Sequence, residues 1–270
     1  MSLIKNFFKK TFANPYIANL DIDSKEAVNI HKQIIKMNLL LIKHYEFIYK
    51  YFKNIDESLS EVSLPSLEIG SGGGFLKEYL PKVITSDVVK SIGIDRVEDA
   101  CQLTFDDKSL KAIYANGVLH HLKDPGACLE EVQRALAPGG VFVCNEPSSN
   151  FFGYFMNRYF HDEPTDRYVK DWQMPETFKS GRLSGANMAI AYIIFKRDRI
   201  KFSKRFPNLI VSSIIYHDFL RYSLSGGLSY RPFVPRFLFG AVNFFEKALR
   251  PFMPVLGNNM IVTIRKIQNI

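Results

Sequence analysis

The sequence is poor in cysteine and contains no long apolar run. Cys101, Cys128 and Cys144 are its three cysteines, and no two of them form a CxxC pair. We therefore expect neither a disulfide framework nor a thiolate metal site, but reduced thiols in the cytoplasm. Met1–Lys10 lacks the continuous apolar core of a signal peptide, and no stretch reaches the roughly 18 apolar residues of a spanning helix. We accordingly expect neither a secretory leader nor a membrane span.

Acidic charge is scarce outside one part of the chain. The formal net charge is +8, yet residues 61–147 contain 8 Lys and Arg against 13 Asp and Glu. Residues 148–270 contain 18 Lys and Arg against 8 Asp and Glu. The basic excess is either an ordinary solvated surface or an attraction for a phosphorylated acceptor or the face of a membrane.

Strand and helix patterns alternate through the middle of the chain, which predicts an α/β fold with a mostly parallel sheet. A helix with Ser24 as its N-cap is predicted over 24–53. The predicted strands are 67–69, 83–85, 92–97, 112–115, 141–144, 209–216 and 260–264, and the other predicted helices are 74–80, 125–136 and 237–249. We divide the chain into an N-terminal helical segment (1–60), a core (61–147), an inserted cap (148–205) and a part that completes the sheet (206–270).

A glycine-rich turn is the strongest signal in the sequence. Gly70, Gly72 and Gly74 follow the strand at 67–69, and Glu68 precedes the first of them. Glycine lets the backbone approach a ligand closely at such a strand-to-helix turn. The spacing differs from the GxGxxG of nicotinamide enzymes. An acidic residue at this place suits a ligand with an ammonium group better than a pyrophosphate.

Polar residues follow the next strands as well. Asp87 ends the second strand, where a carboxylate can accept both hydroxyls of a ribose. Asp99 follows the third strand and Asn116 the fourth, at the edge where open α/β sheets bind ligands. Only four residues separate Asp87 from Ile92. Because a parallel crossover normally needs a dozen or more residues, either this crossover is unusually short or the third strand is misplaced.

Together these features resemble class I S-adenosylmethionine (SAM)-dependent methyltransferases, and their type 11 branch in particular. The resemblance implies a Rossmann-like sheet with an antiparallel C-terminal strand. It covers 67–146 through the segments LEIGSGGG (67–74), TSD (85–87), EDA (98–100), ANGVLHHL (115–122) and EEVQRALAPGG (130–140). The cap resembles that of an uncharacterised subgroup of this family through HDEP (161–164), IIFKRDR (193–199) and LSGG (224–227).

The resemblance implies SAM as the cofactor and assigns a role to each matching position. The positions are Glu68 (methionine amino group), Gly70, Ser71 and Gly72 (methionine and ribose), Asp87 (ribose diol), Asp99 and Ala100 (adenine) and Asn116 (pocket floor beside the sulfonium).

Methyl transfer to a hydroxyl needs a general base. His121, after the fourth strand, is one candidate, and a histidine packed beside the cofactor is its alternative role. His161 and Glu163 in the cap are further candidates. The alternatives there are a plain polar loop, or a divalent ion held by His161 and two carboxylates of the segment 161–166. We assign no metal ligand from the sequence.

The cap is expected to cover the carboxyl edge of the sheet and to form much of the acceptor pocket. It leaves the fifth strand at that edge, and it is far longer than a plain connection requires. The aromatic segment 233–256 is expected to form core or a homodimer face, with contact to a membrane-bound acceptor as the alternative.

The leading hypothesis is a small-molecule methyltransferase, namely an O-methyltransferase acting on a saccharide or lipid-linked glycan. The alternatives are a C- or N-methyltransferase of a lipid-like or quinone acceptor, and a catalytically silent SAM-binding module that recruits a partner. We expect no nucleic-acid partner, because the basic charge forms no clear stripe and no RNA-binding motif occurs.

Overall fold

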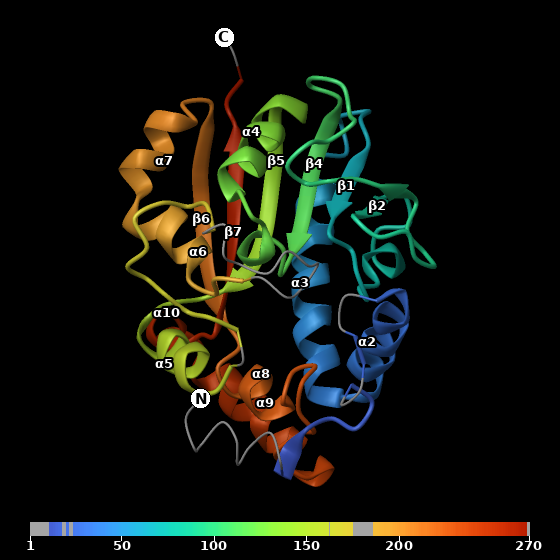
Figure 1. The fold of residues 1–270 in the computed structure, drawn as a ribbon, viewed down its shortest axis with the longest axis vertical. Coiled ribbons are helices and arrows are strands. Elements are labelled where there is room, and N and C mark those ends of the chain that lie inside the picture. Colours follow the sequence, from blue (N-terminus) through green and yellow to red (C-terminus); the bar gives the residue numbers. More distant parts are fainter. Residues whose placement is uncertain (1–10, 18–19, 22–23, 162, 175–185, 269–270) are drawn as a thin grey trace.

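A seven-stranded sheet in the order β3-β2-β1-β4-β5-β7-β6 forms the centre of the protein (Figure 1). The computed structural model describes residues 11–17, 20–21, 24–161, 163–174 and 186–268. The first five strands are parallel, whereas β7 runs antiparallel to both β5 and β6. The predicted Rossmann-like methyltransferase sheet is therefore confirmed. The strands are β1 Ser66–Ile69, β2 Ile84–Asp87, β3 Arg96–Val97, β4 Leu110–Asn116, β5 Leu136–Pro147, β6 Leu209–His217 and β7 Asn259–Lys266.

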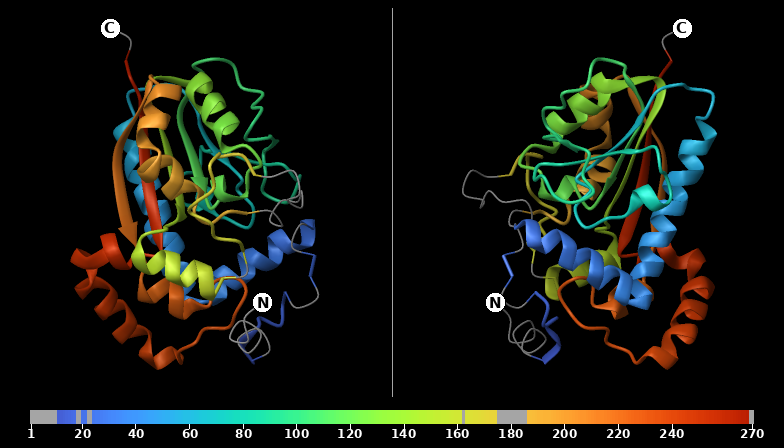
Figure 2. Two further views of the ribbon diagram at one scale, coloured as in Figure 1. Left: turned by 60° about the vertical axis from the view of Figure 1, so that its left-hand side comes forward. Right: turned by 90° about the vertical axis from the view of Figure 1, so that its right-hand side faces the viewer.

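Helices cover both faces of this sheet, and further helices lie beyond its carboxyl edge (Figures 1 and 2). The α-helices are α2 Lys25–Met37, α3 Leu39–Ser58, α4 Pro125–Ala135, α5 Phe151–Tyr159, α6 Ile190–Tyr192, α7 Arg199–Arg205, α8 Leu220–Ser225, α9 Phe239–Ala248 and α10 Met253–Leu256. Shorter turns are η1 Leu76–Glu78, η2 Leu119–His121, η3 Ile193–Arg197, η4 Arg236–Leu238 and η5 Arg250–Phe252.

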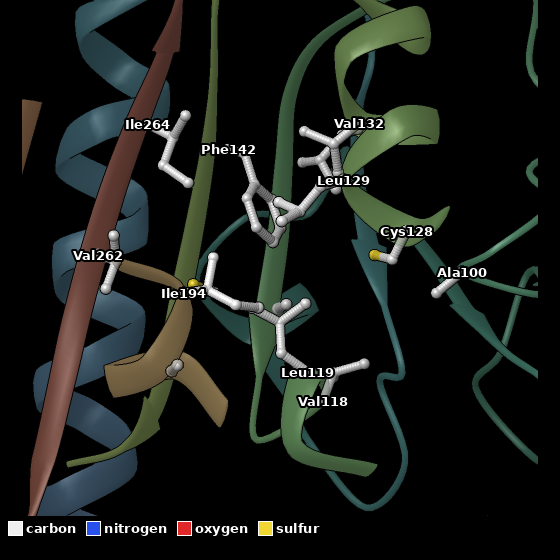
Figure 3. Close-up of a cluster of buried hydrophobic side chains, with 14 of the residues drawn as sticks. Ala100, Val118, Leu119, Cys128, Leu129, Val132, Phe142, Ile194, Val262 and Ile264 are labelled. Carbon is white, nitrogen blue, oxygen red and sulfur yellow. The ribbon is translucent and has the colours of Figure 1, made fainter. Parts of the chain in front are cut away.

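The central strands are buried on both faces because successive side chains point to opposite sides. Phe142 of β5 packs with Leu129 and Val132 of α4 in one core cluster, which Figure 3 shows. Its neighbour Val143 belongs to the second cluster, on the side of α3. Each such buried side chain contributes about 1.5–3 kcal/mol. The near-continuous apolar strands are thus explained by helices on both faces.

The single helix predicted over 24–53 is wrong, because it is broken at Asn38 into α2 and α3. The Asn38 side chain accepts hydrogen bonds from the backbone N–H groups of Leu40 and Leu41, at 3.2 and 3.1 Å. Its Nδ2 donates to the carbonyl of Ser225 in α8, at 2.8 Å. An asparagine in this position is both the N-cap of α3 and a tertiary anchor. The apolar period alone does not reveal such a break.

Two further predictions are corrected near the glycine turn. The helix predicted over 74–80 is only the short turn η1. The third strand is shorter and begins later than the predicted 92–97, since β3 spans only Arg96–Val97 and follows a helix-free connection. Asp95 holds this connection in place without a helix. Its Oδ2 accepts a hydrogen bond from Thr85 N at 2.9 Å, and its Oδ1 forms an ion pair with Lys77. The crossover is therefore short, and the strand was placed too early.

β5 also begins earlier than expected. Its first residue is Leu136, directly after α4, so the predicted strand over 141–144 is the middle of a longer strand. Among the described residues, no helix has the length and apolarity needed to cross a bilayer.

Candidate active site

One large cavity, of about 1620 Å³, lies at the carboxyl edge of the sheet. One half of it is lined by the ends of β1, β2 and β4 and the turns that follow them. The other half is lined by α3, by α5 and the chain after it, and by α8 with the residues up to Phe233. All eight predicted cofactor positions lie in the first half, which we call the cofactor half. We call the other half the acceptor half. His121, His161 and Glu163 also line the cavity.

The glycine turn is held in a shape that other residues rarely adopt. Gly70 and Gly72 have φ angles of +61° and +46°. A Cβ on Gly70 would lie 2.6 Å from Val118 Cγ2, so this glycine also permits close packing on the turn after β4. A Cβ on Gly73 would lie 2.8 Å from the carbonyl oxygen of Val28. Helix α2 therefore presses directly on the turn, a contact that the sequence did not reveal.

Asp87 fastens this turn from the neighbouring strand. Its Oδ2 accepts a hydrogen bond from Gly72 N at 2.9 Å, and its Oδ1 accepts from Val89 N at 3.1 Å. The side chain is buried and borders the cavity. A carboxylate offers about four lone-pair sites, so these two hydrogen bonds do not by themselves prevent Asp87 from accepting from a diol.

Glu68 is a buried carboxyl group with an unfilled bonding capacity. Its Oε2 has no hydrogen-bond partner among the described residues. Burial raises the pKa of Glu68 to about 8; the hydrogen bond from Ser71 opposes this shift and the charge of Asp87 adds to it. An ammonium group at Oε2 would supply the missing partner and favour the ionised form. This orphaned oxygen therefore fits the methionine amino group of SAM.

The remaining cofactor positions border the same half of the cavity. Asp99 is exposed, and its Oδ1 accepts from Cys101 N at 2.8 Å. Ala100 is buried within the core cluster of α4 (Figure 3). The Oδ1 of Asn116 accepts from Asn145 Nδ2 at 2.8 Å, which fixes the end of β4 against the end of β5.

A buried carboxylate and an imidazole form the polar centre between the two halves. Nδ1 of His120 lies 2.6 Å from Oε2 of Glu146. The other oxygen, Oε1, accepts from the backbone N–H groups of Val118 and Leu119, at 2.9 and 2.8 Å. A carboxylate with both oxygens engaged in this way accepts the Nδ1–H of the imidazole, which leaves Nε2 as the basic nitrogen.

The cap brings His161 and Glu163 to this centre, where the predicted His121 already lies in the turn after β4. Oε2 of Glu163 lies 3.6 Å from Nε2 of His120. This oxygen is buried and has no hydrogen-bond partner among the described residues. Burial alone would raise the pKa of Glu163, but the nearby His161, His120 and His121 lower it overall. The ring of His121 lies beside that of His120, with centroids 4.1 Å apart, and His161 Nδ1 accepts from Glu163 N. Asp162 lies outside the described residues.

His120 is a functional residue that the sequence alone did not reveal. The segment His120-His121 offers two identical side chains, and only the tertiary position of Glu146 distinguishes them. A second buried cluster, in the acceptor half, was likewise not indicated by the sequence. There, His44 and His217 both contact Oδ2 of Asp218, at 2.5 and 2.9 Å. These residues come from α3 and from the end of β6, so no local spacing indicated them.

The Lys and Arg residues of the described part of the cap do not line the cavity. Among the described lining residues, only Lys123 carries a permanent positive charge. Arg167 donates to the carbonyl oxygens of Ser149 and Asn150, and Arg197 pairs with Asp198. These arginines support the fold of the cap.

Residues 67–144 match the family model described as a methyltransferase domain. This segment contains β1, the glycine turn, Asp87 and the turn with His120. The sheet around it has the methyltransferase strand order described above. The chain therefore carries a class I SAM-dependent methyltransferase domain, with SAM as the cofactor of that domain.

Comparison with solved structures matches the chain to methyltransferases at low identity. Phosphoethanolamine N-methyltransferase 2 of Haemonchus contortus is 13% identical, with a TM-score of 0.46; the match covers 100% of this chain and 61% of that protein. Geranyl diphosphate C-methyltransferase of Streptomyces coelicolor A3(2) is 14% identical, with a TM-score of 0.47 and coverage of 94% and 89%. A putative methyltransferase of Bacillus halodurans C-125 is 14% identical, with a TM-score of 0.44 and coverage of 79% and 98%.

Proposed function

We propose that this protein transfers the methyl group of SAM to a hydroxyl of a small-molecule acceptor, and that the acceptor is a saccharide or the glycan of a lipid-linked saccharide. The observation that carries the proposal is the Glu146–His120 pair beside Glu163. A hydroxyl is a poor nucleophile until a base removes its proton, whereas an amine needs no strong base. A carboxylate-oriented imidazole in the cavity is suited to that task.

SAM, when bound, supplies the transferable methyl group on its sulfonium. The chain's own residues bind and orient it. Glu68 would hold the amino group, and the turn Gly70–Gly72 would lie against the methionine and ribose. Asp87 would accept the ribose hydroxyls, with Asp99 and Ala100 beside the adenine and Asn116 on the floor of the pocket.

We assign the base to Nε2 of His120. Glu146 holds the ring and stabilises the imidazolium after proton transfer, which makes it a positioning residue. Glu163 lies 3.6 Å from this nitrogen, His121 stands beside the His120 ring, and His161 accepts from the backbone of Glu163. We propose that these three side chains would contact the acceptor hydroxyl. All five side chains belong to the cavity wall or directly support it. Positioning and exclusion of water are the protein's main contributions to a displacement of this kind.

The described lining of the acceptor half offers hydrogen-bonding groups and no Lys or Arg side chain. Asn258 Oδ1 and Asn259 Nδ2 are buried and have no hydrogen-bond partner among the described residues, and both side chains line the cavity. Asn157 and Ser223 add further polar groups. Buried polar atoms are costly unless a ligand pairs with them. A neutral, hydroxyl-rich acceptor meets this need, and any phosphate that it carries would remain outside the cavity.

One observation supports a second candidate mechanism. Ligand atoms of His120, His121 and Glu163 all lie within 4.8 Å of one another, and this spacing would admit a divalent ion. An ion there would activate the hydroxyl directly as a Lewis acid. Glu146 would then orient a ligating histidine.

The proposal is tested with radiolabelled SAM and fractionated cell extract. We expect label in a saccharide fraction, and loss of this transfer in His120→Ala while SAM binding persists. Label in a lipid or quinone fraction that is indifferent to His120→Ala would instead support C- or N-methylation. SAM binding with no labelled fraction would support a silent binding module. We further propose a cytoplasmic location, which the three unpaired cysteines support.

A further inference from the structure

Large apolar side chains are exposed on the helices beyond the carboxyl edge of the sheet. Phe237 is 82% exposed, Phe151 79% and Phe244 67%. We call the exposed apolar residues of α5, η4, α9, η5 and α10 the apolar face. Its members are Phe151, Phe155, Tyr159, Phe237, Leu238, Phe244, Phe245, Phe252 and Val255.

These helices form one continuous layer. Helix α5 packs on α10, and α9 contacts α8, η4 and η5. Figure 2 shows α9 and the segment up to α10 together at one end of the molecule, next to α5. Within α9, Val242 and Glu246 are buried, while Phe244 and Phe245 are exposed. Large exposed apolar side chains gathered on one layer of helices are typical of an interaction site.

The charges on this layer have one sign. Arg158, Arg236, Lys247 and Arg250 are exposed. Glu246 is the only acidic residue between 219 and 258, and it is buried because its carboxylate accepts from the backbone N–H groups of Phe219, Leu220 and Arg221. No acidic residue occurs between 147 and 161. The apolar face is therefore bordered by cations without exposed acids on the same elements.

We propose that the apolar face docks the protein on an anionic lipid bilayer. Aromatic side chains partition into the boundary between headgroups and acyl chains, and the surrounding Arg and Lys side chains attract anionic headgroups. A second copy of the chain is a poorer occupant, because two such faces would bring like charges together. An attachment through side chains of this face is peripheral.

Docking would bring the acceptor half of the cavity close to the lipid surface. The inner side of the same layer lines the cavity through Tyr222, Ser223 and Leu224 of α8 and through Phe233. Helix α9 packs on α8 and carries exposed aromatic residues on its other side. An acceptor anchored in the membrane would need to travel only about the thickness of one helix layer. The docking itself does not depend on which atom is methylated.

Vesicle flotation tests the proposal with the full chain. We expect wild-type protein to float with phosphatidylcholine vesicles that contain phosphatidylglycerol, and to bind pure phosphatidylcholine vesicles much more weakly. Phe237→Ser combined with Phe244→Ser should reduce vesicle-bound protein about tenfold or more. Its matched control is Ile200→Ser, which alters an apolar residue that is 75% exposed on α7. Arg236→Glu combined with Arg250→Glu should reduce binding similarly, with Lys204→Glu of α7 as control.

SAM binding and the melting temperature show whether the variants are folded, and both should be unchanged. Retention of SAM binding without flotation would separate failure of the docking proposal from failure of the proposed enzyme function. Absence of wild-type binding to the anionic vesicles would overturn the proposal. It would also be overturned if light scattering found a dimer that the Phe237 and Phe244 substitutions dissociate.

Discussion

His120 and Glu146 meet across two neighbouring strands, with Nδ1 of the imidazole 2.6 Å from Oε2 of the carboxylate. Glu146 is fully buried at the end of β5, and His120 belongs to the turn after β4. The backbone N–H groups of Val118 and Leu119 hold the carboxylate in place. The pair therefore fixes which nitrogen of His120 faces the cavity, and the first two predictions follow from it.

Replacing His120 by alanine should lower kcat by about 10²- to 10⁴-fold, the usual contribution of a general base. The dissociation constant for SAM should change by less than about twofold, because His120 is not among the residues assigned to SAM. Single-turnover kinetics and calorimetric titration measure the two quantities. His121→Ala is the matched control and should have a clearly smaller effect on kcat. An unchanged kcat in His120→Ala would rule out His120 as the base.

The pH profile should report the environment of His120. Burial by itself lowers the pKa of His120, but the charge and hydrogen bond of Glu146, together with Glu163, outweigh it, so the pKa lies above 6.5. A base acts only when deprotonated, so kcat should fall on the acidic side with a midpoint above 6.5. Glu146→Gln removes the nearby charge and leaves the burial, and the midpoint should move to lower pH. An unmoved midpoint would mean that another group titrates.

Binding of SAM or its demethylated product near pH 7 should release a proton from Glu68. The free carboxyl has a pKa of about 8 and is mostly protonated at that pH. A bound ammonium group favours the carboxylate, so the pKa falls and the proton leaves. Calorimetry in buffers of different ionisation enthalpy measures this release. Glu68→Gln should abolish it and weaken binding by roughly 1.5–3 kcal/mol. The exposed Glu61→Gln should behave as wild type, and proton release from Glu68→Gln would place the titrating group elsewhere.

A chelator distinguishes the two mechanisms proposed for activating the acceptor hydroxyl, namely His120 as general base and a bound divalent ion. If Nε2 of His120 is the base, treatment with a chelator should leave kcat unchanged. If an ion occupies the space between His120, His121 and Glu163, whose ligand atoms lie within 4.8 Å of one another, kcat should fall and recover when the ion is restored. If an ion is bound, Glu163→Gln should also prevent this recovery, because the substitution removes one of the ligands of the ion.

The cofactor half was predictable from the sequence because its signals are local. Glu68, the glycine turn and Asp87 lie next to strands that the apolar pattern reveals, and parallel strands bring their carboxyl ends to one edge. The acceptor half was much less predictable. Asn38 ends one helix and caps the next, and Asp218 joins His44 to His217 across more than 170 residues. The choice between His120 and His121 depended on Glu146, which no spacing rule connects to them.

The contact of α2 with the glycine turn gives the last prediction. A Cβ on Gly73 would lie 2.8 Å from the carbonyl oxygen of Val28 and 3.0 Å from Lys32 N. Backbone atoms cannot rotate away, so Gly73→Ala should displace α2 or distort the turn. We expect a loss of about 1–3 kcal/mol in the free energy of unfolding, as for other overpacked sites, and weaker SAM binding. Gly240→Ala is the matched control, because a Cβ there meets no atom within 4 Å and Gly240 lies in helix α9. It should be neutral or stabilise the protein by up to about 1 kcal/mol, since alanine favours helix. Chemical denaturation of both variants measures the difference, and equal stabilities would show that α2 does not press on the turn in solution.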